Sequence, residues 1–156
     1  MDELTIDSDL PPESEADGNY VEYKIVYNIT GPTSELERIE ASSITQIQLR
    51  LDHGEGRALY FFGVEDNGNK IGIPMPLMLQ SLNAFHAVLQ KAGGYILDID
   101  MRCVGNSITH IGQRKLTRPF YRDILGLESN IQPERYIACI KVKIKWAFKK
   151  ITLTQM

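Results

Sequence analysis

The residues best suited to chemistry are three lysines near the C-terminal end of the chain. Lys141, Lys143 and Lys145 alternate with Val142 and Ile144. In an extended strand, side chains two positions apart share one face and lie about 6.6 Å from each other. Phosphates along a nucleic-acid strand have a comparable spacing, so the row predicts an RNA-binding surface. A charged strand edge that prevents aggregation explains the same pattern equally well.

Charge is unevenly distributed along the chain. Residues 1–19 contain seven acids and no base, whereas residues 101–156 contain eleven bases and three acids, a local charge of +8. Such polarity is typical of a protein that meets two different partners. The bases expected to bind nucleic acid are Arg114, Lys115, Arg118, Arg122, Lys141, Lys143, Lys145, Lys149 and Lys150. The acids expected to bind a protein partner are Asp7, Asp9, Glu13, Glu15 and Asp17.

Motifs for catalysis are missing from the sequence. There is no Gly-rich phosphate loop, no Cys-x-x-Cys, no His-x-x-x-His and no serine in a nucleophile elbow. His53, His86 and His110 lack a partner at the spacing of metal ligands, and Asp98 and Asp100 fit a solvated strand face. We therefore expect no enzyme, metal, cofactor or small-molecule substrate. A small-molecule sensor of ferredoxin-like fold is a weaker possibility without a recognisable ligand motif.

The compartment is predicted from what the sequence lacks. No apolar run approaches the roughly 18 residues of a membrane span, and the acidic N-terminus has no signal-peptide core. Cys103 and Cys139 lie in strand-like apolar runs and are expected to be buried free thiols in a reducing environment. The sequence therefore predicts a cytoplasmic protein without membrane contact, and we expect no homo-oligomer.

The central element predicted from the sequence is a β-hairpin over Arg57 to Ile73. Apolar and aromatic residues occupy both faces of its first half, a pattern typical of a strand buried at the centre of a sheet. Asp66-Asn67-Gly68 provides residues that tolerate positive φ, so the turn is expected there. Helical periodicity precedes and follows this region, which makes it the middle of a β-α-β-β-α-β succession.

The elements around the hairpin follow from alternation, helical spacing and capping residues. Strands are predicted over 20–28, 95–104 and 135–148, helices from Thr33 or Ser34 to about Asp52 and from Pro76 to Ala92, a loop over 105–119 and a helical turn over 120–127. This order predicts an α+β, ferredoxin-like sandwich with two helices on one face. The basic C-terminal strand is added as an edge strand or extension.

Three regions are expected. Residues 1–19 form an acidic extended arm, 20–104 the α+β domain, and 105–156 a basic loop and strand packed on the same domain. The arm lacks aromatic residues and contains Pro11-Pro12, so it is expected to be disordered alone and ordered on a partner.

Several motifs in the first two-thirds of the chain point to a known family. They are Leu10-Pro11-Pro12-Glu13, Gly18 to Lys24, Gln46 to Leu51, Gly54 to Arg57 and, most closely, Gly63-Val64-Glu65-Asp66-Asn67-Gly68. Residues 10–104 thereby resemble the N-terminal region of elongation-factor-like GTPases of the GTP-binding protein 1 and 2 group. In that family a GTPase domain follows. The present sequence contains none, so the resemblance carries over no GTP binding or hydrolysis.

What the resemblance implies is an accessory domain linked to translation and RNA turnover. A free-standing version is similar to a microsporidian dormancy factor in the exit-tRNA site of an idle ribosome. One hypothesis is therefore a hibernation factor that inhibits translation by occupying a tRNA site, with basic residues on rRNA and the acidic arm on ribosomal proteins. The alternative is an adaptor that binds a translation or RNA-decay factor through a sheet edge or the arm.

Overall fold

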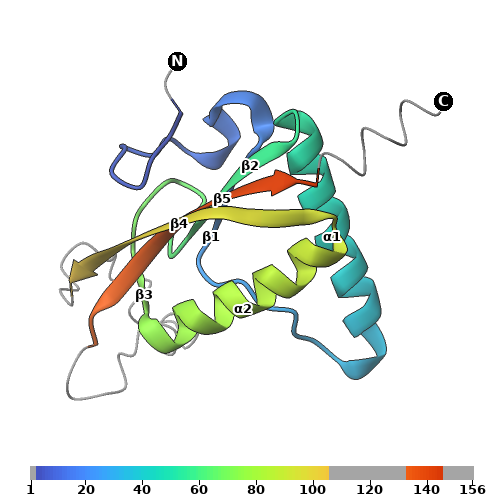
Figure 1. Cartoon of the computed structure of the whole chain (residues 1–156). Helices are drawn as coiled ribbons and strands as arrows, with labels where there is room; N and C mark the ends of the chain where they lie inside the picture. The colour runs from blue at the N-terminus through green and yellow to red at the C-terminus, as the bar shows by residue number, and fades with distance from the viewer. Residues whose placement is uncertain (1–2, 106–132, 146–156) are drawn as a thin grey trace.

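The structure, a computed structural model, describes residues 3–105 and 133–145 (Figure 1). The described residues form one mixed sheet, in which β2 (Arg57–Phe62) lies between β1 (Val21–Lys24) and β5 (Arg135–Ile144). β1 is parallel to β2, and β5 is antiparallel to it. Every residue from Ala58 to Phe62 is at most 2% exposed, which confirms the prediction of a strand buried on both faces.

The basic strand β5 is central, so its placement at an edge is wrong. It pairs with β2 along one side and with β4 (Gly94–Gly105) along the other. The reason is that one face of β5 is apolar. Ala138, Ile140 and Val142 on this face are all at most 1% exposed under the helices. A strand with such a face gains more free energy inside the sheet than at its rim. Protection of an edge therefore does not explain the lysine row.

The predicted hairpin is also wrong, although its turn is present. β3 (Ile73–Pro74) does not pair with β2. It pairs with β5 at Tyr136 and Arg135, on the same side of β5 as β2 and just beyond the end of β2. Residues 63–72 form a loop between β2 and β3. The two ends of the loop are joined by the Gly72 N–H, which donates to the Gly63 carbonyl at 2.8 Å. Both glycines have positive φ, and a Cβ on Gly63 would lie 2.7 Å from the Tyr136 carbonyl oxygen. The Gly68 N–H donates to the Glu65 carbonyl at 2.9 Å in the expected turn.

Both helices lie on one face of the sheet (Figure 1). α1 (Leu36–His53) follows a short 3-10 turn, η3 (Thr33–Glu35), and α2 (Met75–Lys91) begins with Pro76 in its first turn. Phe85 of α2 is the centre of an aromatic cluster, with ring centroids 5.1 Å from Tyr27, 4.6 Å from Tyr60 and 5.4 Å from Phe62. The α+β class is confirmed, and the arrangement is consistent with a ferredoxin-like fold. No helix within the described ranges is long and apolar enough to cross a bilayer.

The opposite face of the sheet is covered by residues 3–20 (blue in Figure 1). This segment includes the 3-10 turns η1 (Glu13–Glu15) and η2 (Asp17–Asn19). Ile6 and Ala16 are buried against a cluster that includes Leu59 and Phe61. Composition predicts a disordered arm here, and the structure differs because the few apolar residues of the segment meet an apolar sheet face. Their burial stabilises the ordered state despite the surrounding acids.

Polar contacts fix the segment at several points along its length. The Tyr23 hydroxyl donates to the Pro11 carbonyl at 2.8 Å, and the Lys70 ammonium donates to the Ile6 carbonyl at 3.0 Å. The Glu13 carboxylate accepts the Tyr23 N–H at 2.9 Å and an Arg50 N–H at 3.2 Å. Arg50 also reaches the buried Glu22 carboxylate, at 2.6 Å. Arg50, Glu13 and Glu22 are called the Arg50 latch below.

Candidate nucleic-acid interface

The lysines of β5 face away from the helices, toward the side that carries the N-terminal segment. In the sheet register, Lys141 is paired with Leu59 of β2, which belongs to the cluster on that side. Lys143 is two residues further along and shares the face. Both side chains are half-buried, and Lys145, directly after β5, is exposed. The predicted apolar face is confirmed from Ala138 to Ile144, whereas on the opposite face Lys141 and Lys143 follow the buried Ile137 and Cys139.

One register position brings three candidate RNA-binding side chains together. Lys143 is paired with Arg57 on β2 and with Tyr95 on β4. Directly opposed residues have Cβ atoms about 4.5–5.5 Å apart on the same face. Arg57, Lys143 and Tyr95 therefore form a row across three strands, called the basic row below. Tyr95 is 40% exposed, and the Arg57 guanidinium lies 5.8 Å from the centre of the Tyr20 ring.

A hollow of about 220 Å³ lies beside the basic row. Its walls come from three strands and the N-terminal segment: Glu3, Arg57, Ala58, Leu97, Lys141, Val142 and Lys143. Leu97 has no paired residue on β5. Its neighbours Ile96 and Asp98 are paired with the consecutive residues Val142 and Lys141, so Leu97 forms a β-bulge. This bulge leaves Leu97 54% exposed. The hollow thus combines three cations, the Glu3 carboxylate and an apolar wall, with Asp98 directly opposite Lys141. Cations beside an apolar wall suit a nucleotide, which has both a phosphate and a base.

Acids of the N-terminal segment reach the same surface. A Glu3 carboxylate oxygen lies 3.8 Å from an Arg57 nitrogen, and an Asp7 oxygen lies 3.4 Å from an Arg102 nitrogen. Arg102 is a further base on β4, and it also pairs with Asp100 at 2.5 Å. These carboxylates lower the positive potential of the face, and the pairs are exposed enough for solvent to screen them.

The predicted site residues divide into three groups. Lys141, Lys143 and Lys145 lie at or next to the basic row. The predicted bases Arg114, Lys115, Arg118, Arg122, Lys149 and Lys150 lie outside the described residues. Among the acids, Asp9 and Glu15 are exposed, Asp7 pairs with Arg102, Asp17 begins η2, and Glu13 belongs to the Arg50 latch.

Glu13 differs from the other acids because its carboxylate points into the molecule. Burial is the largest influence on it and raises its pKa, against the lowering effect of the Tyr23 N–H. Its polar contacts are made within the chain, to Tyr23 and Arg50. Of the predicted arm acids, it is therefore poorly placed to reach another protein.

Arg57 and Tyr95 are the candidate residues that sequence reasoning missed. They are separated by 37 intervening positions, and neither belongs to a linear pattern with the lysines. Both residues are neighbours of Lys143 only because β5 lies between β2 and β4, and only the tertiary structure shows this strand order. The available signal in the sequence is Tyr95 itself, an aromatic residue at the start of a strand whose opposite face carries the apolar residues.

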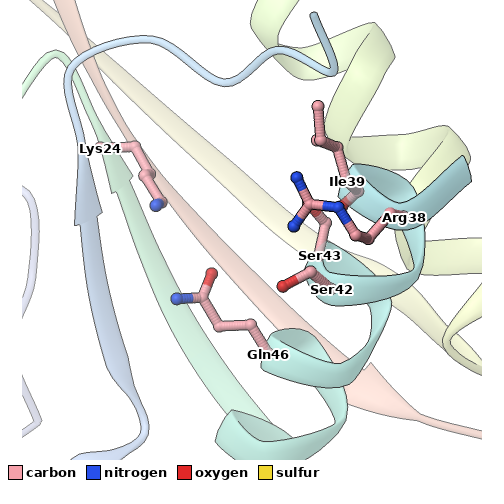
Figure 2. Close-up of a pocket in the computed structure, with 6 residues that line it drawn as sticks. All are labelled: Lys24, Arg38, Ile39, Ser42, Ser43 and Gln46. Atoms are coloured by element: carbon pink, nitrogen blue, oxygen red, sulfur yellow. The ribbon is translucent and has the colours of Figure 1, made fainter. Parts of the chain in front are cut away.

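A second polar groove lies between β1 and α1, where Figure 2 shows Lys24 and Gln46 pointing into the space between the two elements. Its volume is about 280 Å³, and its walls are Lys24, Arg38, Ile39, Ser42, Ser43 and Gln46. Lys24 lies 3.6 Å from the Glu22 carboxylate, and Arg38 lies 3.4 Å from the Glu35 carboxylate. Both cations of the groove have an acidic neighbour, as Arg57 of the basic row has in Glu3, and no exposed aromatic ring among the described residues lines the groove.

The cysteines and acids do not assemble into a reactive centre in the described part of the chain. Burial raises the pKa of the Cys139 thiol to about 12, so it stays protonated and unreactive at neutral pH. Both cysteines are free thiols, as predicted, but Cys103 is exposed, so its predicted burial is wrong. Within residues 3–105 and 133–145, no cluster of three or more histidines, cysteines or acids could hold a metal ion.

The fold and the site define an α+β domain with a cationic and aromatic surface on its sheet. Over 87 residues the chain is 41% identical to "GTP-binding protein 2" of Mus musculus and, equally, of Homo sapiens. The match covers 56% of this chain and 13% of each relative, so it spans only a small part of the relatives' length. No protein-family model and no solved structure matches the chain.

Proposed function

We propose that this protein is a non-catalytic, cytoplasmic ribosome-binding factor. It occupies a tRNA site, the exit site in this proposal, and holds an idle ribosome in a dormant state, as the resemblance to dormancy factors implies. The observation that supports it is the basic row with Lys141 and Lys145 beside it, on a sheet face that the helices leave free. The similarity to GTP-binding protein 2 is consistent with an accessory domain acting in translation.

Electrostatic attraction between the basic side chains and RNA phosphates provides most of the binding free energy in this proposal. Lysine and arginine side chains displace counterions from RNA phosphates, so affinity falls steeply as salt concentration rises. No chemical step is needed, because occupation of a tRNA site by itself excludes tRNA. The apolar face of β5 packs against the helices and so fixes the strand that carries the lysines.

The test is ribosome pelleting across a salt series with the full chain. Lys141→Gln/Lys143→Gln should reduce affinity at every salt concentration. It should flatten the slope of log affinity against log salt by about one to two units, since each phosphate contact contributes about 0.7–0.9. The matched control is Arg38→Gln/Lys91→Gln, which removes two bases from the helix side. Equal behaviour of both double variants would show that net charge, and not this face, governs binding.

The alternative function is an adaptor that binds a translation or RNA-decay factor, and one observation favours it. β4 is a twelve-residue strand whose neighbour in the described sheet is β5, and it exposes Leu97 and Ile99. An edge strand of this kind can accept an added strand from a partner protein. Sedimentation of the tagged chain from growing and starved cells distinguishes the two functions. Comigration with ribosomes supports the first, and migration with a smaller complex supports the adaptor.

A further inference from the structure

We propose that the basic row binds single-stranded RNA, with the Tyr95 ring stacking on an unpaired base while Lys143 and Arg57 hold the adjacent phosphates. This inference rests on the proposed function and specifies its ligand: an unpaired nucleotide segment and not a continuous duplex. It assigns Tyr95 a role in recognition that the lysine row alone does not contain.

Tyr95 stands apart from the other tyrosines in the described ranges. Tyr27 and Tyr60 are buried in the helix-side cluster, and Tyr136 packs against it; Tyr23 is buried on the opposite side, where Tyr20 packs beside it. Tyr95 belongs to neither cluster and is 40% exposed. A large aromatic ring left out of both clusters has little role in the described hydrophobic packing, and exposed aromatic residues on a sheet are typical stacking platforms for bases.

The neighbours of Tyr95 fit the two ends of a nucleotide. Lys143 is directly opposite on β5, and Arg57 is one strand further along the same row. Exposed Leu97 forms an apolar wall of the adjacent hollow, where Lys141 and Lys143 supply positive charge. A base lying on Tyr95 would therefore have its phosphates over the lysines. An acidic peptide would use the cations and leave the ring without a flat partner.

A single strand fits this surface better than a duplex does. In A-form RNA the bases are stacked on one another, so a side chain on a flat sheet cannot reach their faces. Loops, bulges and chain ends present unstacked bases, and stacking on an aromatic residue is tolerant of sequence. The row is short and lies on one sheet face, so it suits one or two splayed nucleotides.

The test uses fluorescence anisotropy with the full chain and three labelled RNA probes, compared at equal phosphate concentration: a ten-nucleotide single strand, the same strand with abasic sites, and a blunt-ended duplex. Wild type should bind the single strand at least about fivefold more tightly than the abasic strand, the lower end of measured stacking effects. Tyr95→Leu should lose this preference and bind the abasic strand as wild type does. Tyr95→Phe, which keeps the ring, should retain it.

Each alternative outcome has a distinct meaning. If Lys141→Gln/Lys143→Gln weakens binding of all probes while Tyr95→Leu behaves like wild type, stacking is refuted and the proposed function stands. If the double lysine variant has no effect on any probe, the RNA-binding function fails and the inference fails with it. If wild type binds the abasic strand or the blunt-ended duplex as tightly as the single strand, stacking on an unpaired base is also refuted. Equal affinity for a polyglutamate peptide of matched charge would identify the row as a protein-binding surface. Thermal melting of each variant confirms that it is folded.

Discussion

The two faces of the sheet are covered in different ways. The helix face is packed by side chains of α1 and α2, with three aromatic rings around Phe85. The other face is covered by a segment near the N-terminus that buries Ile6 and Ala16 and is otherwise tied by polar contacts. The first face provides rigidity, and the second leaves room beside the segment for the basic row. If the proposed function holds, the helix face provides stability and the opposite face provides binding.

The largest effect is expected on the helix face. Phe85→Ala should destabilise the protein by about 3–5 kcal/mol, because it removes a fully buried ring and leaves a cavity among three aromatic neighbours. Ile6→Ala, on the other face, should lose about 2 kcal/mol, the low end for such a change, since a segment near the chain end can relax. Urea unfolding measures both. Equal losses would show that the two faces are equally integral to the fold.

A smaller effect is expected at the Arg50 latch. Arg50→Ala leaves the buried Glu22 carboxylate without its closest partner and frees Glu13, so a loss of about 1–3 kcal/mol is expected. Amide hydrogen exchange should accelerate over residues 4–16 much more than in α2. Arg38→Ala on the same helix is the control, because the exposed Arg38–Glu35 pair should be worth at most about 0.5 kcal/mol. Uniform acceleration across the chain would mean that the latch supports the whole fold.

The smallest effect concerns the acid beside the basic row. Glu3→Gln removes the carboxylate 3.8 Å from Arg57, so affinity for single-stranded RNA should rise about two- to fivefold at low salt. The gain should shrink at high salt, where the pair is already screened. Asp9→Asn makes the same charge change at an exposed position and should raise affinity less. Identical gains in both variants would mean that Glu3 does not counteract the row specifically.

Local patterns predicted much of this fold. The run Ala58 to Phe62 has no polar face, and such a strand is stable only where both sides are covered. The helices were recognisable from apolar spacing and from Pro76, and their observed bounds differ from the predicted ones by a few residues. The lysine alternation correctly predicted the apolar face of β5 and the opposite orientation of Lys141 and Lys143, but not the burial of Ile137 and Cys139 on that second face. Each of these features depends on neighbours within a few residues along the chain.

Long-range pairing could not be predicted in the same way. Nothing local distinguishes a hairpin over Arg57 to Ile73 from a loop inserted along one side of β5, because the difference lies in which strand Ile73 pairs with. The ordering of residues 3–20 likewise depends on an apolar surface formed by β1, β2 and β5. Composition describes the segment in water, where its acids dominate, and takes no account of the sheet it meets.

By itself, the sequence determined which residues are apolar, which face of each strand they occupy, and that basic side chains gather on one face of the last strand described. Those properties follow from backbone periodicity and side-chain chemistry. Only the tertiary structure placed β5 between β2 and β4 and so brought Arg57 and Tyr95 beside Lys143. The physical reason is that strand order depends on the total burial and hydrogen bonding of the whole sheet, a sum over contacts distant in sequence.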